Sequence, residues 1–585
     1  MPTVRLPLVG VANPRSIDGQ ATVAAGYDQR FVNVIFDAIK NPITGKTTLY
    51  IEKRPGWVTS QLVEAGSPST GLIKTDILGR VVSAFGETNS TIYDSQTSVG
   101  AITGRAIHFL ETILGTTGYV LIRSSDGTGW YYASDAATQL TYTGKVTSGG
   151  VQVDAIASTA GMYHGQAVTS ANMAGGSRVS TVISTSQINL TLAATGSATE
   201  AITKTPIAKI LSANFVATGT NKSAFNEMDG FIFYCTEDGY LYNSDLNSIH
   251  VFEASNKIAV NMAPDLPITV ARHKNWIIVF GNSSTEFFYN AGNAAGSPLN
   301  RSAQYFKRVG SQNQRSVVGL EDDIYFVSSS RDGDTKVERL RGMGLEKIST
   351  AATDKIIGTA NATGSNIYAN AFNLGGYSYL TLSLVSAEEE SLLKLEDDFY
   401  VLQENGDQII LEFSASTPTN LSRLLVCNIT LNIWCEWTGT LATFVKGPGA
   451  GSVNNIIATS RIDTSGKIYS INPSADAEVY ADDGAPYSMI IQTSKLDFGT
   501  DRKIFIQSIT LNGDVQDSGT ALLEASDDDY RTWKTMGTFD LTQKVQNITR
   551  CGSYKGAGGR AFKLTHTANA AFRAQSLDIT YTVGV

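Results

Sequence analysis

Residues 228–243 read Met-Asp-Gly-Phe-Ile-Phe-Tyr-Cys-Thr-Glu-Asp-Gly-Tyr-Leu-Tyr-Asn, with two aromatic and β-branched runs on either side of the turn Glu237-Asp238-Gly239. The pattern returns at residues 276–290, where an apolar run is followed by Asn282-Ser283-Ser284 and a second aromatic run. Two such runs joined by a short Asp, Asn, Gly or Ser turn are typical of a β-hairpin. Because the hairpin recurs, the sequence predicts a repeated all-β architecture, which favours a scaffold over an enzyme.

Similar strand pairs occur on both sides of this segment, at residues 72–93, 119–132, 323–327, 424–437 and 455–471. Short strands at this spacing are typical of a β-propeller or of a string of sandwiches. The number of hairpins indicates about six blades. Helical periodicity is weak, and its best candidate is the brief segment 386–395.

Two changes in character along the chain indicate additional modules. Residues 146–204 contain only four charged side chains, yet their apolar residues still alternate as in strands. We expect a small β module there, with a disordered segment as the alternative. After about residue 489 the strand candidates fit a separate sandwich. The expected fold class is therefore all-β, with a β-propeller-like core, an inserted small β module and a C-terminal β-sandwich. The expected domains are an N-terminal lead with the first propeller blades (1–145), the inserted module (146–205), the remaining blades (206–488) and the C-terminal β-sandwich (489–585).

The composition supports a large β protein and disfavours one class of partner. The 585 residues are 42% hydrophobic and 17% charged, and they include 54 glycines. The formal net charge of −9 is opposite to that of proteins that bind nucleic acid tightly by displacing counterions from its phosphates. Contact with DNA is therefore expected to be weak and non-specific.

Cysteine spacing and hydropathy bear on the compartment. Cys235, Cys427, Cys435 and Cys551 have no disulfide-framework spacing, so we expect reduced core residues. The first residues lack the apolar stretch of a secretory signal, and no apolar run reaches the roughly 18 residues of a membrane span. We expect synthesis in the cytoplasm and no membrane span.

Motifs for catalysis or cofactor binding are weak. Gly45-Lys46-Thr47 resembles the end of a phosphate-binding loop, but Lys40 occupies the position where that loop needs glycine. The histidines have no metal-site spacing; they are His108, His164, His250, His273 and His566. We therefore expect no catalytic, cofactor-binding or metal-binding residues, and no cofactor. A calcium site at residues 332–334 or 527–529 is an alternative that the sequence leaves open.

Carboxylates provide the other alternative. Glu388-Glu389-Glu390 and Asp527-Asp528-Asp529 could support glycoside cleavage if a pair faced a cleft, although such runs are usually solvated. Residues 526–533, Ser-Asp-Asp-Asp-Tyr-Arg-Thr-Trp, resemble an Asp-box with Tyr530 in the glycine position. That motif predicts a hairpin turn and no catalytic site.

Four stretches of the chain point together to one family. They are Leu6-Pro7-Leu8, Gln29-Arg30-Phe31-Val32-Asn33, Arg54-Pro55-Gly56-Trp57, and residues 276–288 with Phe-Gly-Asn-Ser-Ser-Thr-Glu-Phe after an apolar strand. The first three resemble the start, and the fourth resembles the most distinctive stretch, of the packaged-DNA stabilisation proteins, or tail hubs, of short-tailed bacteriophages. The inserted module resembles small β modules of phage structural proteins and departs from the shorter family pattern.

The resemblance implies a structural virion protein with no catalytic residues. Such a protein forms a homo-oligomeric ring, a hexamer in the family, below the portal-adaptor ring, and it closes the filled head. It contacts a tail fibre or spike and a plug or needle protein, and genomic DNA passes transiently through its channel. The runner-up is a carbohydrate-binding or glycoside-cleaving β-propeller of a receptor-binding protein. A single-strand nucleic-acid binder is disfavoured by the acidic composition.

Overall fold

The computed structural model describes residues 2–9, 29–40, 47–76, 79–137, 139–216, 223–362, 366–385, 423–446, 456–471, 480–496, 502–528, 530–555 and 559–584. The regular secondary structure of these ranges is almost entirely β-strand, and the α-helix found in them is α1 (Ala351–Ala362). The all-β fold class is therefore confirmed. Within the same ranges no helix has the length and hydropathy needed to cross a membrane. The helix candidate at residues 386–395 lies outside the described residues.

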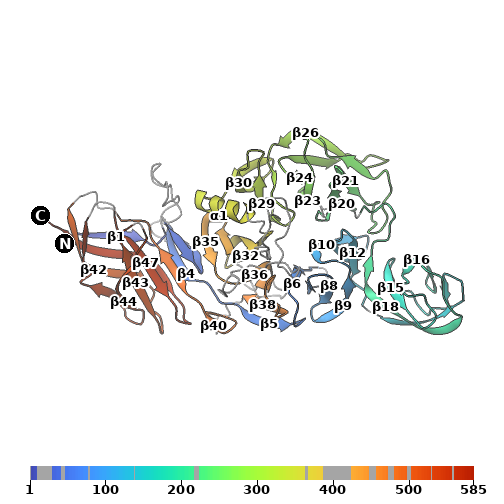
Figure 1. Cartoon of the computed structure of the whole chain (residues 1–585), viewed down its shortest axis with the longest axis horizontal. Helices are drawn as coiled ribbons and strands as arrows, with labels where there is room; N and C mark the ends of the chain where they lie inside the picture. The colour runs from blue at the N-terminus through green and yellow to red at the C-terminus, as the bar shows by residue number, and fades with distance from the viewer. Residues whose placement is uncertain are drawn as a thin grey trace, which may run out of the picture.

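Seven sheets surround a common axis in the described part of the chain, as in a β-propeller (Figure 1). The first two are β6 (Ser69–Lys74), β7 (Val81–Phe85), β8 (Ser90–Asp94) and β9 (Thr97–Ile102), then β10 (Ala106–Leu114), β11 (Thr117–Ser124), β12 (Gly129–Ala133) and β18 (Ala198–Lys209). The next three are β19 (Asn226–Met228), β20 (Phe231–Thr236), β21 (Tyr240–Asn243) and β22 (Lys257–Ala259), then β23 (Pro267–His273), β24 (Trp276–Gly281), β25 (Thr285–Asn290) and β26 (Leu299–Lys307), then β27 (Gly310–Ser311), β28 (Val317–Leu320), β29 (Asp323–Ser329), β30 (Thr335–Arg341) and β31 (Gly344–Lys347). The last two are β32 (Asn366–Leu374), β33 (Tyr377–Val385), β34 (Arg423–Asn428) and β35 (Ile433–Trp437), then β36 (Leu441–Lys446), β37 (Ile456–Ser460), β38 (Lys467–Ile471) and β5 (Val58–Leu62).

The expected number of about six blades is one short of these seven sheets. The seventh sheet closes the ring by pairing β5 with β38, so that Val58 lies opposite Ser470. The hairpin of β37 and β38 in this sheet is the strand pair expected at residues 455–471. Its fourth strand, β5, comes from a distant part of the chain and was not expected there.

Aspartates in the blade turns explain why the hairpins form locally. Asp126, Asp238 and Asp463 each accept a hydrogen bond from the backbone N–H two residues later, at 2.9, 3.2 and 2.8 Å. Such a bond closes the turn without help from the rest of the fold, which is why Asp is favoured there. The repeated sequence pattern is thus a repeated turn geometry.

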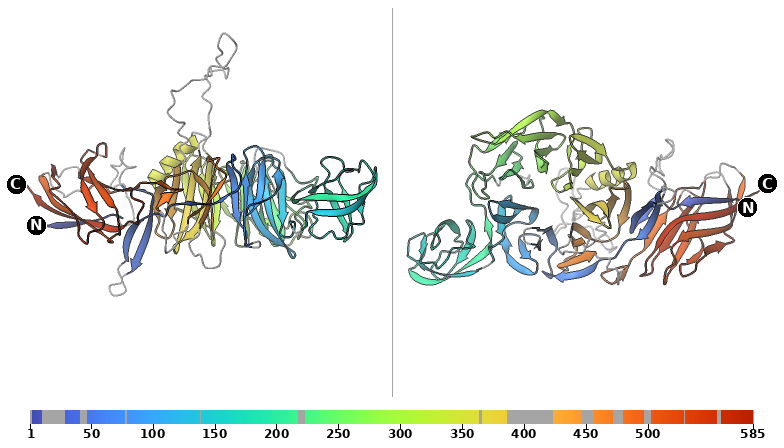
Figure 2. Two further views of the ribbon diagram at one scale, coloured as in Figure 1. Left: turned by 90° about the horizontal axis from the view of Figure 1, so that it is seen from below. Right: turned by 180° about the vertical axis from the view of Figure 1, so that it is seen from behind.

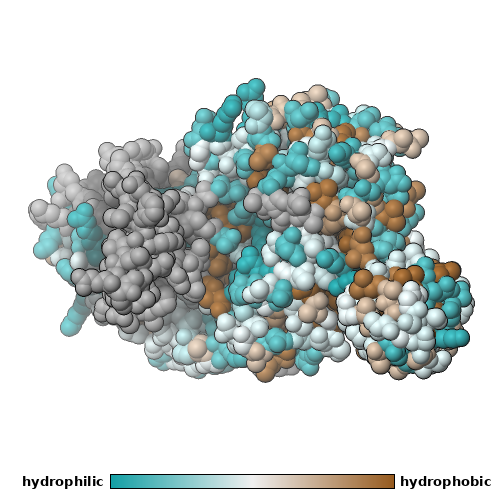
Figure 3. Space-filling view, turned by 45° about the vertical axis from the view of Figure 1, so that its right-hand side comes forward, coloured by the Kyte–Doolittle hydropathy of each residue, from teal (hydrophilic) through white to brown (hydrophobic). Residues whose placement is uncertain are grey.

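The inserted module grows out of the second sheet and has its own core. Its strands are β13 (Thr141–Val146), β14 (Gln152–Asp154), β15 (Gln166–Thr169), β16 (Val179–Ser184) and β17 (Gln187–Leu190). β18 pairs with β13 through residues 198–203 and with β12 through residues 207–209, so one strand joins module and ring. The core of the module includes Val146, Val153 and Ile188, all fully buried. On the face in Figure 3, hydrophobic residues gather where the module meets the ring.

Two packed sheets form the sandwich at the opposite side of the ring (Figure 2). One contains β3 (Val34–Lys40), β4 (Thr47–Lys53), β48 (Arg573–Val583), β42 (Lys503–Gly513) and β45 (Gln546–Thr549), with β1 (Thr3–Pro7) and β46 (Ser553–Lys555) paired alongside. The other contains β2 (Arg30–Val32), β41 (Met489–Gln492), β47 (Ala561–His566), β43 (Thr520–Ser526) and β44 (Lys534–Asp540). Alternating buried residues of both sheets, such as Ile506, Leu564 and Ile579, form one core.

The N-terminal lead belongs to this sandwich, and the propeller begins only at β5. Thr3 pairs with Thr580, and Ile51 pairs with Ala574, so the two ends of the chain share a sheet. The expected grouping of the lead with the first blades therefore differs from the structure. Strand pairing between residues more than 500 positions apart leaves no local pattern in the sequence. β2 also pairs in parallel with β35, which makes the sandwich sheet continuous with the sixth blade.

Candidate functional site

Arg54, from the stretch Arg54-Pro55-Gly56-Trp57, lies at the junction of ring and sandwich. Its side chain is 1% exposed and forms a two-point ion pair with Asp482, at 2.9 and 2.6 Å. Its Nε donates to Asn33 at 3.0 Å, and its Nη2 donates to the Thr438 carbonyl at 3.3 Å. A buried guanidinium needs nearly all of its donors satisfied, and this one binds three separate chain segments.

Aromatic rings enclose the same guanidinium. Its central carbon lies 4.1 Å from the Trp57 ring centre and 4.0 Å from that of Tyr487. Burial raises the pKa of Asp482, although the ion pair with Arg54 opposes the shift. This direction shows that the carboxylate depends on Arg54 to stay ionised in its buried position.

The two family-like motifs at residues 29–33 and 54–57 each contain a position that favours one residue type, Asn33 in the first and Gly56 in the second. Asn33 has a φ of 57°, a left-handed conformation that asparagine tolerates better than most residues. Its amide donates to the Ser488 carbonyl at 2.7 Å and to Thr438 at 2.8 Å. A Cβ on Gly56 would lie 2.0 Å from the Ala481 carbonyl oxygen, so only glycine fits there. These motifs therefore form the junction.

Two more titratable groups are buried next to Arg54. Lys53 donates to the Ala568 carbonyl at 2.7 Å, and burial followed by the charge of Arg54 lowers its pKa to about 8. The ring of His566 is fully buried, and burial followed by the charge of Lys53 lowers its pKa to about 4. Burial and the charge of Arg54 therefore disfavour protonation of Lys53, and burial and the charge of Lys53 disfavour protonation of His566.

The Phe-Gly-Asn-Ser-Ser-Thr-Glu-Phe stretch is also structural. Glu286 is 1% exposed, accepts the Met262 N–H at 2.7 Å and pairs with Arg301 at 3.0 Å. Asp265 accepts the N–H of Ser283 at 2.8 Å and the hydroxyl of Ser284 at 2.7 Å. These bonds hold the β24–β25 turn against the loop before β23, so the stretch fixes the shape of one blade.

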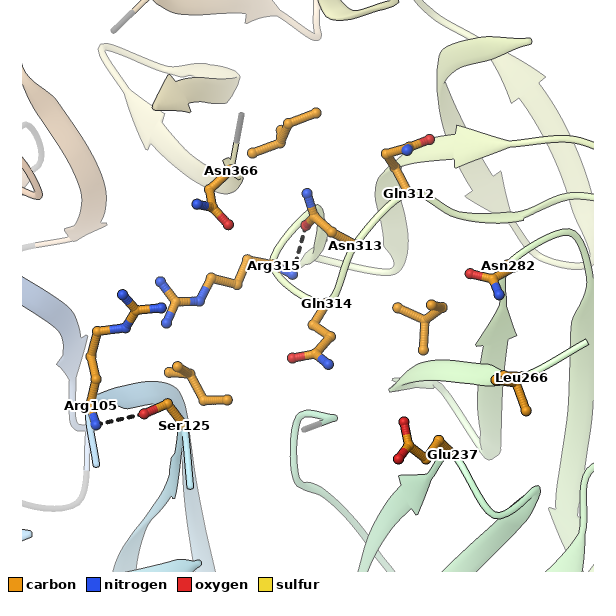
Figure 4. A pocket seen from close by; sticks show the side chains of 13 residues that line it. Arg105, Ser125, Glu237, Leu266, Asn282, Gln312, Asn313, Gln314, Arg315 and Asn366 are labelled. Atoms are coloured by element: carbon orange, nitrogen blue, oxygen red, sulfur yellow. Dashed lines mark hydrogen bonds between the residues drawn. The ribbon is translucent and has the colours of Figure 1, made fainter. Parts of the chain in front are cut away.

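Two adjoining cavities lie along the propeller axis. The narrower one, of about 370 Å³, is lined by residues of one strand from every blade: β6, β10, β19, β23, β28, β32 and β36. The wider one, of about 490 Å³, opens where several of these strands begin (Figure 4). Arg315, Ile107 and Gln314 line both cavities, so Arg315 lies where the two cavities meet.

The lining of the wider cavity is mostly polar. Five carboxamide side chains contribute to it, with Ser125, Glu237 and several aliphatic residues; the carboxamides are Asn282, Gln312, Asn313, Gln314 and Asn366. Figure 4 shows the guanidinium groups of Arg105 and Arg315 pointing toward each other across this space. Among the described residues that line this cavity, Glu237 contributes the carboxylate.

Three arginines gather at this point. Arg461 pairs with Glu87 at 2.5 Å, and Arg105 approaches the same carboxylate at 3.5 Å. Arg315 has no carboxylate within 4 Å among the described residues; it lies over the Tyr368 ring, 4.8 Å from its centre. Burial alone would raise the pKa of Tyr368, but the charges of Arg315 and Arg461 outweigh it and lower that pKa.

These arginines were not predicted from the sequence. Arg105 and Arg461 lie more than 350 residues apart in the chain, with Arg315 between them, and no sequence spacing connects the three. The usable signal was the polar run Gln312-Asn313-Gln314-Arg315 directly before a strand, which is unusual next to a packed sheet.

The residues considered from the sequence lie in separate places. His164 and His250 stack with ring centres 4.5 Å apart, joining module to ring, and burial lowers the pKa of both. The four cysteines are buried and unbridged. Within the described ranges no three His, Cys, Asp or Glu side chains group as metal ligands. Gly45, Lys46 and residues 388–390 lie outside the described residues.

The Asp-box-like segment is a turn, as its sequence predicts. Asp528 accepts the Thr532 hydroxyl at 2.5 Å, the Thr532 N–H at 2.9 Å and the Ser526 hydroxyl at 2.9 Å, and these bonds lower its pKa to about 2. Tyr530, in the glycine position, has a φ of 65°, the backbone conformation that the motif normally gives to glycine. Asp527 is paired with Arg560 at 2.7 Å. Both carboxylates therefore stabilise the sandwich.

Comparisons with known proteins were made for the structure and for the sequence. Solved structures with some similarity to this chain include an exo-beta-1,3-galactanase from Phanerochaete chrysosporium with galactose (8% identity, 63% of this chain and 98% of that chain, TM-score 0.24), the N-terminal domain of Nup159 (8%, 76% and 98%, TM-score 0.31) and Saccharomyces cerevisiae Sqt1 (8%, 72% and 99%, TM-score 0.31). A search of curated proteins finds no match. Residues 131–386 match the phage stabilisation family described as bacteriophage P22 Gp10, beta-propeller. This match over part of the propeller supports the family expected from the sequence, the packaged-DNA stabilisation proteins of phages.

Proposed function

We propose that this chain is a structural tail hub of a short-tailed bacteriophage. It would form a ring below the portal-adaptor ring, close the filled head, retain the packaged DNA, conduct it at ejection and anchor fibres or spikes. The observation that supports this role is the family match over residues 131–386, which covers β12 to β33. In this role the protein is a virion component that is made in the host cytoplasm.

A ring of identical copies needs two unlike surfaces on each copy, because its contacts are heterologous. The module and the sandwich extend from opposite sides of the propeller (Figure 2) and offer two such surfaces. A homo-hexamer is the assembly that the family resemblance implies. The remaining surfaces would contact the adaptor, the fibre or spike, and a plug or needle protein.

The proposed role requires no catalysis. The Asp-box-like carboxylates are held in hydrogen bonds and an ion pair, and one carboxylate lines the wider axial cavity. The net charge of −9 suits a conduit, because a wall with few exposed Lys and Arg forgoes the counterion release that makes proteins adhere to DNA.

The test is assembly. Purified protein should be measured by size-exclusion chromatography with light scattering, alone and with its adaptor ring, and virions should be imaged by electron microscopy. We expect six copies in a ring at the tail vertex, and particles that lack this chain should lose their DNA to nuclease. A chain absent from virions, or particles that keep their DNA without it, would refute the proposal.

A further inference from the structure

We infer that the arginine cluster of the propeller axis, defined as Arg105, Arg315 and Arg461 with Glu87 and Tyr368, binds a doubly charged, phosphate-class oxyanion. The inference concerns a ligand site inside each subunit and does not depend on the proposed tail role. Its first support is the count of charges. The guanidinium groups of Arg105 and Arg461 approach one carboxylate, Glu87, and their charges also act on Arg315, so the described residues place one carboxylate beside three positive charges.

The second support is the burial of the arginines. The Arg461 side chain is 9% exposed and that of Arg105 is 31% exposed, so water screens their charges only partly. Burial lowers the pKa of Arg315 to about 10, and the charges of Arg105 and Arg461 act in the same direction. Like charges held this close in a partly dry site need an anion to offset their repulsion.

The third support is unused hydrogen-bonding capacity. Nε of Arg105 is buried and has no hydrogen-bond partner in the described structure. The Arg315 guanidinium has a long hydrogen bond, 3.5 Å from Nη2 to the Ala106 carbonyl, and a second one to the Tyr368 side chain. Buried donors are nearly always satisfied, so free guanidinium donors facing a cavity indicate a ligand that accepts hydrogen bonds.

The fourth support is space and chemistry. The cavity of about 490 Å³ is large enough for phosphate, or for a nucleotide that carries one. The forked donors of arginine match the oxygens of phosphate, and a phosphate monoester carries close to two negative charges at neutral pH. The surrounding carboxamides could bind the remaining oxygens or a sugar hydroxyl. Free phosphate and a nucleoside monophosphate share this chemistry, and the experiment below distinguishes them.

The test uses the full-length protein and three probes at equal ionic strength: inorganic phosphate, adenosine monophosphate and acetate. We expect phosphate to raise the melting temperature in a saturating way, since a ligand that binds only the folded state stabilises it. Isothermal titration calorimetry should give one site per chain. Tighter binding of the nucleotide would identify a nucleotide site, and equal binding would identify a site for free phosphate.

Variants connect the binding to the cluster. Arg315→Gln should weaken phosphate binding by about tenfold or more, since it removes a buried charge-assisted contact. Arg105→Gln, at a more exposed position, should weaken it as well and serves if the first variant folds poorly. Arg341→Gln is the matched control, because its side chain is 69% exposed and lies on β30. The inference is overturned if acetate stabilises as strongly as phosphate, if no probe binds, or if both cluster variants bind like the control.

Discussion

Replacement of Arg54 by methionine should destabilise the junction between ring and sandwich far more than loss of a surface ion pair would. Methionine keeps much of the side-chain volume between Trp57 and Tyr487 but removes the charge and its hydrogen bonds. It leaves Asp482, whose side chain is 15% exposed, without its partner. Removing one member of a buried pair typically costs about 3–5 kcal/mol, and we expect a loss in that range.

The loss should depend on pH, with a sign that follows from Asp482. Without Arg54, burial is opposed by the Trp57 backbone hydrogen bond and the charge of Lys53 but no longer by the ion pair, so the folded-state pKa of this carboxyl rises further above the unfolded value. A carboxyl with a raised folded pKa binds more protons when folded, so its penalty is present at neutral pH and shrinks as the pH falls through that pKa. The double variant Arg54→Met/Asp482→Asn should likewise recover part of the lost stability, because it removes the unpaired charge.

Urea unfolding followed by tryptophan fluorescence suits this measurement, because Trp57 and Trp437 lie 4.1 and 5.7 Å from the Arg54 guanidinium carbon. The matched control is Arg5→Met, which breaks the exposed pair with Asp578 and should cost about 1 kcal/mol or less. If Arg54→Met costs no more than the control, or if the double variant is as unstable as the single one, the junction does not depend on this ion pair.

Three further predictions concern stability. His566 has a pKa of about 4 when folded, so its side chain takes up a proton at a higher pH in the unfolded chain than in the folded one. The free energy of unfolding should therefore be about 2 kcal/mol lower at pH 5 than at neutral pH. The urea midpoint should fall in acid, and it should fall less for His566→Leu. Gly56→Ala should lower the melting temperature, because the new Cβ would lie 2.0 Å from the Ala481 carbonyl oxygen. Gly358→Ala in α1, where a Cβ meets nothing within 4 Å, should raise the free energy of unfolding by about 0.5–1 kcal/mol. Equal effects of the two variants would contradict the packing described. Replacing residues 141–203 by Asn-Gly should leave a folded ring. The Lys204 N–H already donates to the Leu140 carbonyl at 2.9 Å, so a two-residue turn can connect residues 140 and 204. Loss of the cooperative melting transition would show that the module is part of the ring core.

The local features of the fold could be predicted from the sequence, and the long-range ones could not. The turns at Asp126 and Asp238 are closed by neighbours within two residues, so their pattern is visible in any short window. The module could be recognised because its alternation is local as well. In contrast, the pairing of Val58 with Ser470, and of Thr3 with Thr580, depends on chain segments that meet only in the folded state.

The candidate site shows the same division. Each arginine of the axial cluster is unremarkable in its own segment, because its significance comes from the other two and from a carboxylate supplied by Glu87. The family-like motifs Asn33 and Arg54 could be recognised from the sequence, but their shared task at one junction could not. Their contact, 3.0 Å between side chains 21 positions apart, depends on Thr438 and Asp482 from distant strands.

The two additions to the ring differ in how firmly they are attached, and this difference bears on their roles. The sandwich shares a continuous sheet with the sixth blade through β2 and β35, and Arg54 ties three chain segments together beside that seam. The module is continuous with the ring through β18, supplemented by side contacts such as the His164–His250 stack. Motion at the sandwich seam would break the bonds of Arg54 to three chain segments together with the pairing of Val32 and Glu436, whereas motion of the module would pivot about β18. In the proposed assembly the sandwich would therefore fix the geometry, and the module would adjust to a neighbour.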